Sequence, residues 1–581
     1  MIDSVTLAYF KCFREQRFEL ADHIVLAGPN NGGKTTLIQS INVWNLALRK
    51  WLERRGPQSG SQAKLRTGVP LTRQDFTPVP LRIMDDLWTD TATGLRKDEL
   101  EEGQKLGQPR VLTIELAGHD LSEDIREEWK LGFELRYQNT ELVYVKPVPE
   151  HLADIDLASK SVKVVHVPPF SGIGSEEPLH DRPYQDLLVG QGKAGDIIRN
   201  LLLQIHRDAD ESLWKELVTK VEDIFGYRLL PPEYSGTPHI LCRYLKGIPT
   251  GQGLGGLPVL DVSSAGSGFH QVLLLLAFLY ARPASVLLLD EPDAHLHVVL
   301  QKQIYDELRR LAMHRRAQLV VATHAEVLID STNPQDILSF YRVPHRLVSD
   351  ADRDQVREAI RRLPATDILL AERAESILYV EDRTDFEILR SFAVVLGHPL
   401  REWFSQTPFW HSNRGRNPRD ARAHFFALKA IAPLMRAALL LDGDNRGLPD
   451  REIATDGLTV FRWKRYEVES YLLHPTALAR YISTIAGPLV AIAAENFLKD
   501  QMPPVVFRDP LGAHEYFVTT PASKTVLPEL FSHLRLKVRK QDFYLVGEQM
   551  KPEEIPPEVG DVLNAIHAVL IPAAAATQPG S

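Results

Sequence analysis

The chain has 581 residues and a formal net charge of −9, with 44% hydrophobic and 25% charged residues. This length is too great for one hydrophobic core, so we expect a globular protein of about two to four domains. The acidic balance is not that of a general nucleic-acid binder, and two cysteines are too few for a disulfide framework or a thiolate zinc cluster. Few cysteines and no signal peptide at the N-terminus predict a cytoplasmic protein. The most apolar stretch, residues 272–289, is interrupted by Arg282 and Pro283, so it predicts a buried helix, a turn and a strand, with no membrane partner.

The first 36 residues predict two short strands, a glycine-rich loop and the start of a helix. The loop GPNNGGKT (28–35) fits G-x-x-x-x-G-K-[ST] and follows the apolar run IVLA, as that motif requires. Backbone N–H groups of such a loop hold phosphates, while the lysine reaches the β- and γ-phosphates and the threonine binds Mg²⁺. The sequence therefore predicts ATP and Mg²⁺ binding through Asn30, Asn31, Gly32, Gly33, Lys34, Thr35 and Thr36.

The next part of the chain predicts structural elements rather than chemistry. Residues 56–110 are polar and predict loops with short helices, and residues 111–116 and 132–137 alternate as half-buried strands do. Residues 161–172 form a strand pattern that ends in Pro-Pro. Between about 180 and 226 the apolar spacing is helical. This segment is either an inserted helical module for dimerisation or a set of ordinary covering helices.

Two apolar strand patterns that end in functional side chains follow. VLLLDEP (286–292) ends in Asp290, which would hold Mg²⁺, and Glu291, which would orient and polarise the attacking water. Taken alone, this is also what a buried strand with acids at its end looks like, but the phosphate loop favours the ATPase interpretation. QLVVATHAEVL (318–328) ends near His324, which is placed to sense the γ-phosphate.

A loop at the start of another helical pattern, residues 263–279, completes the set. Its Gly-Ser-Gly segment exposes backbone N–H groups and a helix N-terminus to a phosphate. The four motifs in this order resemble the ABC-type ATPase heads of the structural-maintenance and recombination-repair class. The phrases VPPFSG, SAGSGFHQVL and DEPDAHLH resemble more narrowly the head of the OLD (overcoming lysogenization defect) family, whose relatives include the Gabija nuclease subunit and PARIS-type defence proteins.

In such heads two copies enclose ATP between them. The resemblance implies a homodimer or a higher even oligomer formed through the heads. It also implies that Gln74 occupies the Q-loop position. The loop that contacts the phosphates of the second copy is then formed by Ser264, Gly266, Ser267 and Gly268.

Carboxylates gather in the last third of the chain. The apolar strand pattern in LYVEDRTDFEILR (378–390) is followed by Glu381 and Asp385, and the strand pattern at 437–441 is followed by Asp442 and Asp444. Farther on, FRWKRYEVESYLL (461–473) supplies Glu467 and Glu469. Strand-end acids separated by helical segments suit a parallel sheet whose carboxyl edges converge. Oxygen ligands at one edge bind Mg²⁺ or Mn²⁺, and such ions support phosphodiester cleavage.

This acidic pattern resembles a Toprim domain, the catalytic unit of topoisomerases, primases and OLD nucleases. The resemblance implies that Glu381, Asp442 and Asp444 are catalytic metal ligands and that Asp385 joins them. Glu469 lies in a phrase that resembles the Toprim-like domain of the PARIS effector. One departure is Asp382, which stands where a glycine usually follows the glutamate; it either joins the metal site or adds repulsion. OLD-like nucleases also carry a late catalytic lysine, for which Lys540 and Lys537 are candidates and Lys540 is our prediction from position.

The predicted fold is α/β: an ABC-type ATPase head with a helical insertion (1–370), a Toprim-like doubly wound parallel sheet (371–570) and a disordered tail (571–581). The predicted function is an ATP-hydrolysing, Mg²⁺-dependent endonuclease of the OLD type that cuts DNA in anti-phage defence, with a partner defence protein as a further expectation. One alternative is a PARIS-like effector that cleaves RNA, in particular tRNA. The other is an ATP-driven sensor or scaffold that cleaves nothing.

Overall fold

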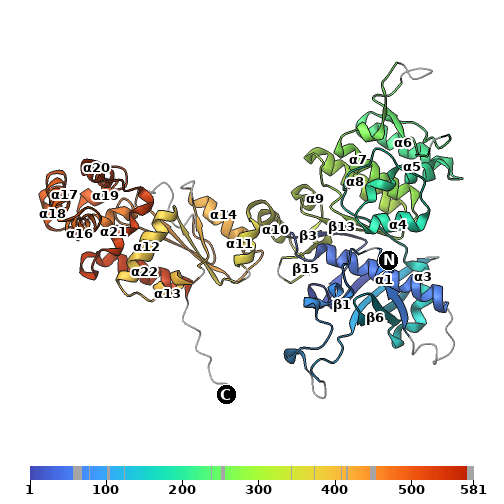
Figure 1. Cartoon of the computed structure of the whole chain (residues 1–581), viewed down its shortest axis with the longest axis horizontal. Helices are drawn as coiled ribbons and strands as arrows, with labels where there is room; N and C mark the ends of the chain where they lie inside the picture. The colour runs from blue at the N-terminus through green and yellow to red at the C-terminus, as the bar shows by residue number, and fades with distance from the viewer. Residues whose placement is uncertain are drawn as a thin grey trace. The chain divides into compact units, whose positions relative to one another are not determined.

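The computed structural model describes residues 1–571 except 57–67, 78, 101–104, 123–124, 237, 250–255, 342, 372, 407, 414–416 and 445–452. The tail predicted to be disordered lies outside the described residues apart from Ile571. The chain divides into two compact units, Met1–Ile360 and Arg361–Ser581 (Figure 1). Helix α10 (Asp350–Arg362) crosses this division, and α11 (Ala365–Ala371) belongs to the second unit. Within the described residues, no helix is both long enough and apolar enough to cross a membrane.

The first unit contains a six-stranded antiparallel sheet, with helix α1 (Lys34–Arg55) packed into the same hydrophobic core. Trp44 on α1 stacks on Trp129 of the sheet, and its indole N–H donates to the carbonyl of Leu131. The order of the strands across the sheet is β2 (Phe13–Glu19), β1 (Ile2–Phe10), β5 (Leu112–Ser122), β6 (Ile125–Asn139), β7 (Leu142–Pro147) and β4 (Val69–Thr72).

A second six-stranded sheet carries the nucleotide motifs. Its order is β15 (His345–Arg346), β14 (Ile337–Ser339), β3 (His23–Ala27), β13 (Gln318–Thr323), β12 (Val286–Asp290) and β8 (Val164–Val167). Strands β3, β13 and β12 are parallel neighbours. Each ends where a predicted motif begins, and the carboxyl ends of parallel strands meet at one edge of a sheet. The motifs that are far apart in sequence are therefore brought to one edge.

The helical region of the first unit surrounds α7 (Ser267–Ala281), whose residues from Phe269 to Ala281 are all buried. This helix, its turn and β12 confirm the interpretation of the most apolar stretch. The segment with helical spacing forms α4 (Arg182–Gly190), α5 (Ile198–His206) and α6 (Glu211–Phe225), of which α5 and α6 pack against α7. Figure 1 shows these helices in green around α7. The remaining elements are α3 (Ile155–Ser161), α8 (Val298–His314), α9 (Glu326–Asp330) and a small sheet of β9 (Arg228–Leu229), β10 (Arg243–Leu245) and β11 (Val259–Asp261).

The second unit is built on a four-stranded parallel sheet in the order β17 (Trp410–Ser412), β16 (Ser376–Val380), β18 (Arg436–Leu441) and β19 (Leu458–Arg462). The first strand in sequence, β16, has the second on one side and the third on the other. The chain therefore reverses direction across the sheet between β16 and β18, which is the switch point where α/β sheets bind ligands. Glu381 and Asp442 follow these two strands directly.

Alternate residues of the strands face the two sides of this sheet. Leu378, Val380, Ala438 and Leu440 pack in the core formed with α12 (Arg383–Val395) and the C-terminal helices. On the other side Tyr379 contacts His424 of α14 (Pro418–Leu428). The other helices of the unit are α13 (Leu400–Ser405), α16 (Pro475–Ala486), α17 (Pro488–Gln501), α18 (Pro504–Arg508), α19 (Glu515–Thr519), α20 (Val526–His533), α21 (Tyr544–Glu548) and α22 (Pro557–Leu570).

Candidate functional site

The phosphate loop has a backbone that few residues adopt. Asn31 and Gly33 lie in the left-handed region, with φ of 66° and 100°. A Cβ at Gly33 would lie 2.4 Å from Cζ of Phe13, so this position also requires glycine for space. The loop leads directly into α1, whose N-terminal N–H groups are available to an anion.

The side chain of Lys34 folds back over the preceding residues of the phosphate loop. Its Nζ donates to the carbonyls of Gly28 and Pro29, each at 2.8 Å, and the residue is 6% exposed. Burial lowers the pKa of Lys34, although the nearby charges of Glu291 and Asp290 raise it in part. The ammonium is thus held over the centre of the loop, where the phosphates of a nucleotide would lie.

Thr35 and Asp290, the two predicted Mg²⁺ ligands, meet at the end of β12. The Thr35 hydroxyl donates to Asp290 Oδ1 at 3.4 Å. Burial raises the pKa of Asp290 to about 6, against the opposing effect of the Thr35 hydrogen bond. A hydroxyl and a buried carboxylate are the hard oxygen ligands that Mg²⁺ prefers, so the residues fit this ion.

Glu291 and His324 are also brought together. His324 Nδ1 lies 3.4 Å from Glu291 Oε1, and their hydrogen bond lowers the pKa of Glu291 and raises the pKa of His324. Glu291 adopts φ of 51°, and its backbone N–H donates to the carbonyl of Ala322 at 2.9 Å. Because of this left-handed conformation, the side chains of Asp290 and Glu291 point in different directions although they are neighbours at the end of β12.

Lys34, Thr35 and Glu291 line one cavity of about 490 Å³, whereas Asp290 and His324 are not part of its lining. Its lining is formed by Lys11, Cys12, Asn30, Asn31, Gly33, Lys34, Thr35, Thr36 and Glu291. Gln74 does not line it. That residue follows the edge strand β4 of the antiparallel sheet and lines a different hollow with Phe76 and Tyr184. Ser264 and 266–268 are the residues predicted to contact the phosphates held by a second copy, and we call them the signature residues. They also lie outside this lining, at the N-terminus of α7.

The segment before the signature loop is held by a charged network that the sequence analysis missed. Arg199 and Glu177 are each 1% exposed, and Glu177 accepts hydrogen bonds from the backbone N–H groups of Arg199 and Asn200. Arg199 Nη2 also lies 3.1 Å from Oδ1 of Asp261, which caps the turn Val262–Ser264. These residues are far apart in the chain and form no local pattern, so the sequence carries no signal for them.

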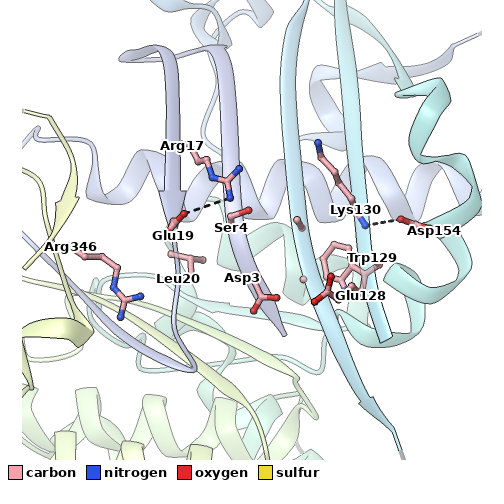
Figure 2. A pocket seen from close by; sticks show the side chains of 12 residues that line it. Asp3, Ser4, Arg17, Glu19, Leu20, Glu128, Trp129, Lys130, Asp154 and Arg346 are labelled. Atoms are coloured by element: carbon pink, nitrogen blue, oxygen red, sulfur yellow. Dashed lines mark hydrogen bonds and ion pairs between the residues drawn. The ribbon is translucent and has the colours of Figure 1, made fainter. Parts of the chain in front are cut away.

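A third hollow, of about 530 Å³, lies on the antiparallel sheet (Figure 2). Figure 2 shows that charged side chains line it: Arg17 pairs with Glu19, and the Asp154 carboxylate accepts a hydrogen bond from the backbone N–H of Lys130. The chemistry of a phosphate loop is missing from its lining. The cavity at Lys34 therefore fits a nucleotide better than this hollow does.

Nucleotide binding is expected to protect Cys12 from alkylation. Cys12 is exposed and lines the cavity, whereas Cys242 is 2% exposed, so a thiol reagent labels Cys12 first. With ATP and Mg²⁺ at ten times the Kd, only about one tenth of the sites are free of nucleotide, so the labelling rate of Cys12 should fall by about 10-fold. Mass spectrometry after timed labelling measures this. Protection that persists unchanged in Lys34→Ala would contradict the assignment of the cavity.

The carboxylates of the second unit converge at the switch point of its sheet. Asp442, Asp385 and Glu469 are 7%, 7% and 1% exposed. Asp442 Oδ1 accepts from the backbone N–H of Val468 at 3.2 Å, which joins the end of β18 to the turn Val468–Leu472. Asp385 Oδ2 accepts from the backbone N–H of Glu381 at 3.1 Å. We call Glu381, Asp385, Asp442 and Glu469 the acid cluster.

The acid cluster is electrostatically strained without a cation. Burial, the charges of Asp385, Glu469 and Glu381, and a hydrogen bond to Glu381 together raise the pKa of Asp442 to about 10. Burial and the charge of Glu469 raise the pKa of Asp385 well above its usual range. Burial raises the pKa of Glu469 to about 7 although Lys540 opposes this. Carboxylates that repel one another in this way fit a divalent cation, which favours their ionised forms.

Lys540 lies at this cluster. Its Nζ is 3.1 Å from Asp382 Oδ2 and 3.1 Å from Glu469 Oε1. The two acids raise the pKa of Lys540 despite its burial, which lowers it. Lys537, the other candidate, is exposed, and its side chain makes no such contact with the described residues.

Asp382, the departure from the Toprim pattern, has two structural roles. Its Oδ1 accepts from the backbone N–H of Thr384 at 2.6 Å and caps α12, while its Oδ2 contacts Lys540. Burial raises the pKa of Asp382, but the charge of Lys540 outweighs this and the net shift is downward. Asp382 is therefore ionised and positions the lysine.

Asp444 differs from the expectation that it faces the same point as Asp442. It is exposed, whereas Asp442 is buried. The reason is that β18 ends at Leu441, so the alternation of an extended strand does not continue through the turn. Gly443 in this turn packs against the chain after β19: a Cβ there would lie 2.0 Å from the Arg465 carbonyl oxygen. Glu467 also points away from the cluster, since its carboxylate accepts from the N–H of Ser523.

Comparison with known proteins bears on the first unit. Residues 181–330 match the family described as "AAA domain, putative AbiEii toxin, Type IV TA system". The matched segment contains the signature loop, Asp290, Glu291 and His324, and it supports an ATPase domain that binds or hydrolyses ATP. No curated protein matches the chain.

The fold comparison finds heads of structural-maintenance-of-chromosomes proteins. The SMC head domain from Thermotoga maritima matches with 16% identity and a TM-score of 0.31, over 58% of this chain and 94% of that chain. An SMC head with a coiled coil and joint from Pyrococcus yayanosii matches with 13% identity and a TM-score of 0.33, over 62% of this chain and 99% of that chain. At these scores we base no argument on the matches. The family match to residues 181–330 supports an AAA-type ATPase domain in the first unit.

Proposed function

We propose that the protein is an ATP-regulated, divalent-metal-dependent endonuclease of the OLD type, with a Toprim-like catalytic domain in the second unit. The observation that carries this proposal is the acid cluster: four carboxylates from three separate segments meet at the switch point of a parallel sheet. Burial raises the pKa values of Asp385, Asp442 and Glu469, and repulsion within the cluster adds to the shifts of Asp385 and Asp442. A bound cation would reverse these shifts. A strained, buried set of acids at such a place is a functional-site signal.

Mg²⁺ or Mn²⁺ bound by the cluster would activate water and stabilise the leaving oxygen of a phosphodiester. The chain's own residues supply the rest. Lys540, held by Asp382 and Glu469, offers a cation to a phosphate oxygen. Glu381 lies directly after β16 and is half-exposed. Asp444 is exposed on the neighbouring turn.

The first unit supplies the regulation in this proposal. ATP bound at Lys34 would favour heads paired through the signature residues of a second copy, and this change in population would control the nuclease. This accounts for signature residues that lie outside the lining of the nucleotide cavity of their own chain. A role in defence against phage DNA and a partner defence protein are part of this proposal and rest on the family resemblance.

DNA is the first substrate class and RNA, in particular tRNA, the second. The second is favoured by the place of Glu469, since the phrase that resembles the PARIS effector contributes a 1%-exposed carboxylate to the cluster. Both substrates carry the phosphodiester that the cluster would cleave.

The test is cleavage of supercoiled plasmid and of total tRNA by the full-length protein, with Mg²⁺ or Mn²⁺ and with or without ATP. We expect metal-dependent cleavage of one substrate, reduced by about 100-fold or more in Asp442→Asn, since loss of a catalytic group has effects of this size. Asp500→Asn, an exposed carboxylate on α17, is the matched control. Equal cleavage by Asp442→Asn and the unaltered protein would refute the assignment, and no cleavage under any condition would leave the ATP-driven scaffold as the better account.

A further inference from the structure

A different group of ligand-type side chains lies in the second unit, on the side of the sheet that α14 covers. Asp367 on α11, His411 on β17 and His424 on α14 each offer one ligand atom, and these three atoms lie within 4.8 Å of one another. Three elements that are separate in sequence thus converge on one point. None of these residues belongs to the acid cluster.

The geometry centres on one carboxylate oxygen. Oδ2 of Asp367 lies 3.1 Å from Nε2 of His424 and 3.9 Å from Nε2 of His411. The two imidazole rings stack, with centroids 4.2 Å apart and an angle of 30° between their planes. The same nitrogen of each ring is therefore turned toward the same oxygen.

The other nitrogen of His424 is held by a buried partner. Its Nδ1 lies 2.9 Å from the hydroxyl oxygen of Tyr379, which is 0% exposed. When Nδ1–H donates to Tyr379, the lone pair of Nε2 faces the Asp367 carboxylate. A cation between these two groups would be attracted to both the nitrogen lone pair and the carboxylate. A ligand histidine whose second nitrogen donates to a polar partner is the usual arrangement at metal sites.

The group could be either a hydrogen-bonded chain from Tyr379 through His424 to Asp367 or a metal site. The hydrogen-bonded chain needs only one histidine, so the position of the second imidazole distinguishes these two explanations. His411 Nε2 is beyond hydrogen-bond distance from Asp367 Oδ2, yet it faces this oxygen beside His424. A metal ion accounts for this approach, because it needs several donors around one centre.

We propose that Asp367, His411 and His424 bind a divalent transition-metal ion, with Zn²⁺ as the ion that this donor set fits. Two imidazoles and one carboxylate are typical of zinc sites that keep a fourth position open, whereas Mg²⁺ prefers oxygen ligands throughout. Tetrahedral bonds of 2.0–2.1 Å place ligand atoms about 3.3 Å apart. Asp367 and His424 are already at this separation, and His411 needs to approach them by at most about 1.5 Å. His411 supplies this movement: its side chain is 36% exposed, against 13% for Asp367 and 7% for His424.

The bound ion would join α11 and α14 to the edge strand β17 of the parallel sheet. This site is independent of the proposed nuclease chemistry, which uses the oxygen ligands at the ends of β16 and β18. Its test therefore needs no cleavage assay.

The experiment uses the full-length protein, stripped of metal and kept in excess Mg²⁺ so that sites with oxygen ligands are filled. Co²⁺ is titrated first, because its visible absorption reports tetrahedral nitrogen and oxygen ligation, and Zn²⁺ affinity is then measured by competition with a chelating dye. We expect one equivalent per chain. His411→Ala should weaken Zn²⁺ binding by at least about 10-fold, the smallest loss usual for groups that support a metal. His514→Ala is the matched control, since His514 pairs with Asp509 without forming a three-ligand group among the described residues.

His411 is half-exposed, so His411→Ala should keep the fold, and the thermal melting curve checks this. Asp367→Asn, which keeps the side-chain shape, is the second variant and should also lose the Co²⁺ absorption. The proposal is overturned if the unaltered protein takes up no Zn²⁺ in competition with the dye. It is equally overturned if His411→Ala and Asp367→Asn bind as tightly as the control.

Discussion

Asp442→Asn is expected to stabilise the metal-free second unit at pH 8 and to abolish its stabilisation by Mg²⁺ or Mn²⁺. The pKa of Asp442 is raised to about 10 in the folded chain, from an ordinary value of 3.8. Between these values the folded state binds more protons than the unfolded state, so the stability of the unit falls as pH rises through this window. At pH 7 the loss is on the order of 4 kcal/mol for a shift of this size, and larger at pH 8.

Asparagine fits the position because it imitates the protonated acid. Its oxygen can accept from Val468 N–H as Asp442 Oδ1 does, and its amide can donate to Glu381. Scanning calorimetry of the full chain from pH 5 to pH 9 measures the effect on the transition of the second unit. Asp500→Asn should follow the unaltered protein at every pH. A variant that is less stable than the unaltered protein at pH 8 without metal would show that the cluster is not strained.

Glu291→Gln is expected to lower ATP hydrolysis by about 100-fold or more while ATP still binds, since a general base contributes effects of this size. Glu291 lines the cavity beside His324, and it makes no contact that holds the loop residues Lys34 or Thr35 in place among the interactions described. Lys34→Ala is expected to do the opposite and lose ATP binding, because the buried ammonium lies over the loop. Phosphate release and fluorescent-nucleotide binding separate the two effects.

Glu291→Gln also tests whether two ATPase heads pair. With hydrolysis blocked, ATP should hold Glu291→Gln in an even oligomer that sedimentation detects, whereas Lys34→Ala should not respond to ATP. Glu127→Gln, an exposed glutamate on β6, is the matched control and should hydrolyse ATP at the ordinary rate. Full hydrolysis by Glu291→Gln would assign the role of the base to another residue.

Sequence patterns could predict the elements that carry both sites because each functional side chain follows an apolar strand directly. The phosphate loop, Asp290 and the Thr323–His324 segment end β3, β12 and β13, and parallel pairing brings such strand ends together. The same reasoning placed Glu381 and Asp442 at neighbouring strand ends. Local periodicity therefore carried most of the information on both sites.

Contacts that depend on turns and on distant segments could not be predicted in this way. The exposure of Asp444 depends on where β18 ends, and the contact of Lys540 with Asp382 joins residues that are 158 positions apart. Asp367, His411 and His424 are spread over a helix, an edge strand and another helix, so no spacing rule joins them. Gln74 was placed by a loose motif match, and its position beyond an edge strand depends on tertiary packing.

In the proposed function, the raised pKa values of the acid cluster would make metal binding a proton-releasing reaction. Asp442, with a pKa of about 10, and Glu469, with a pKa of about 7, hold protons near neutrality that a divalent cation would have to displace. The apparent affinity for the cation would therefore rise with pH, and the heat of binding would depend on the buffer that takes up the protons. Acidity and metal supply would thus act on the second unit as one combined signal.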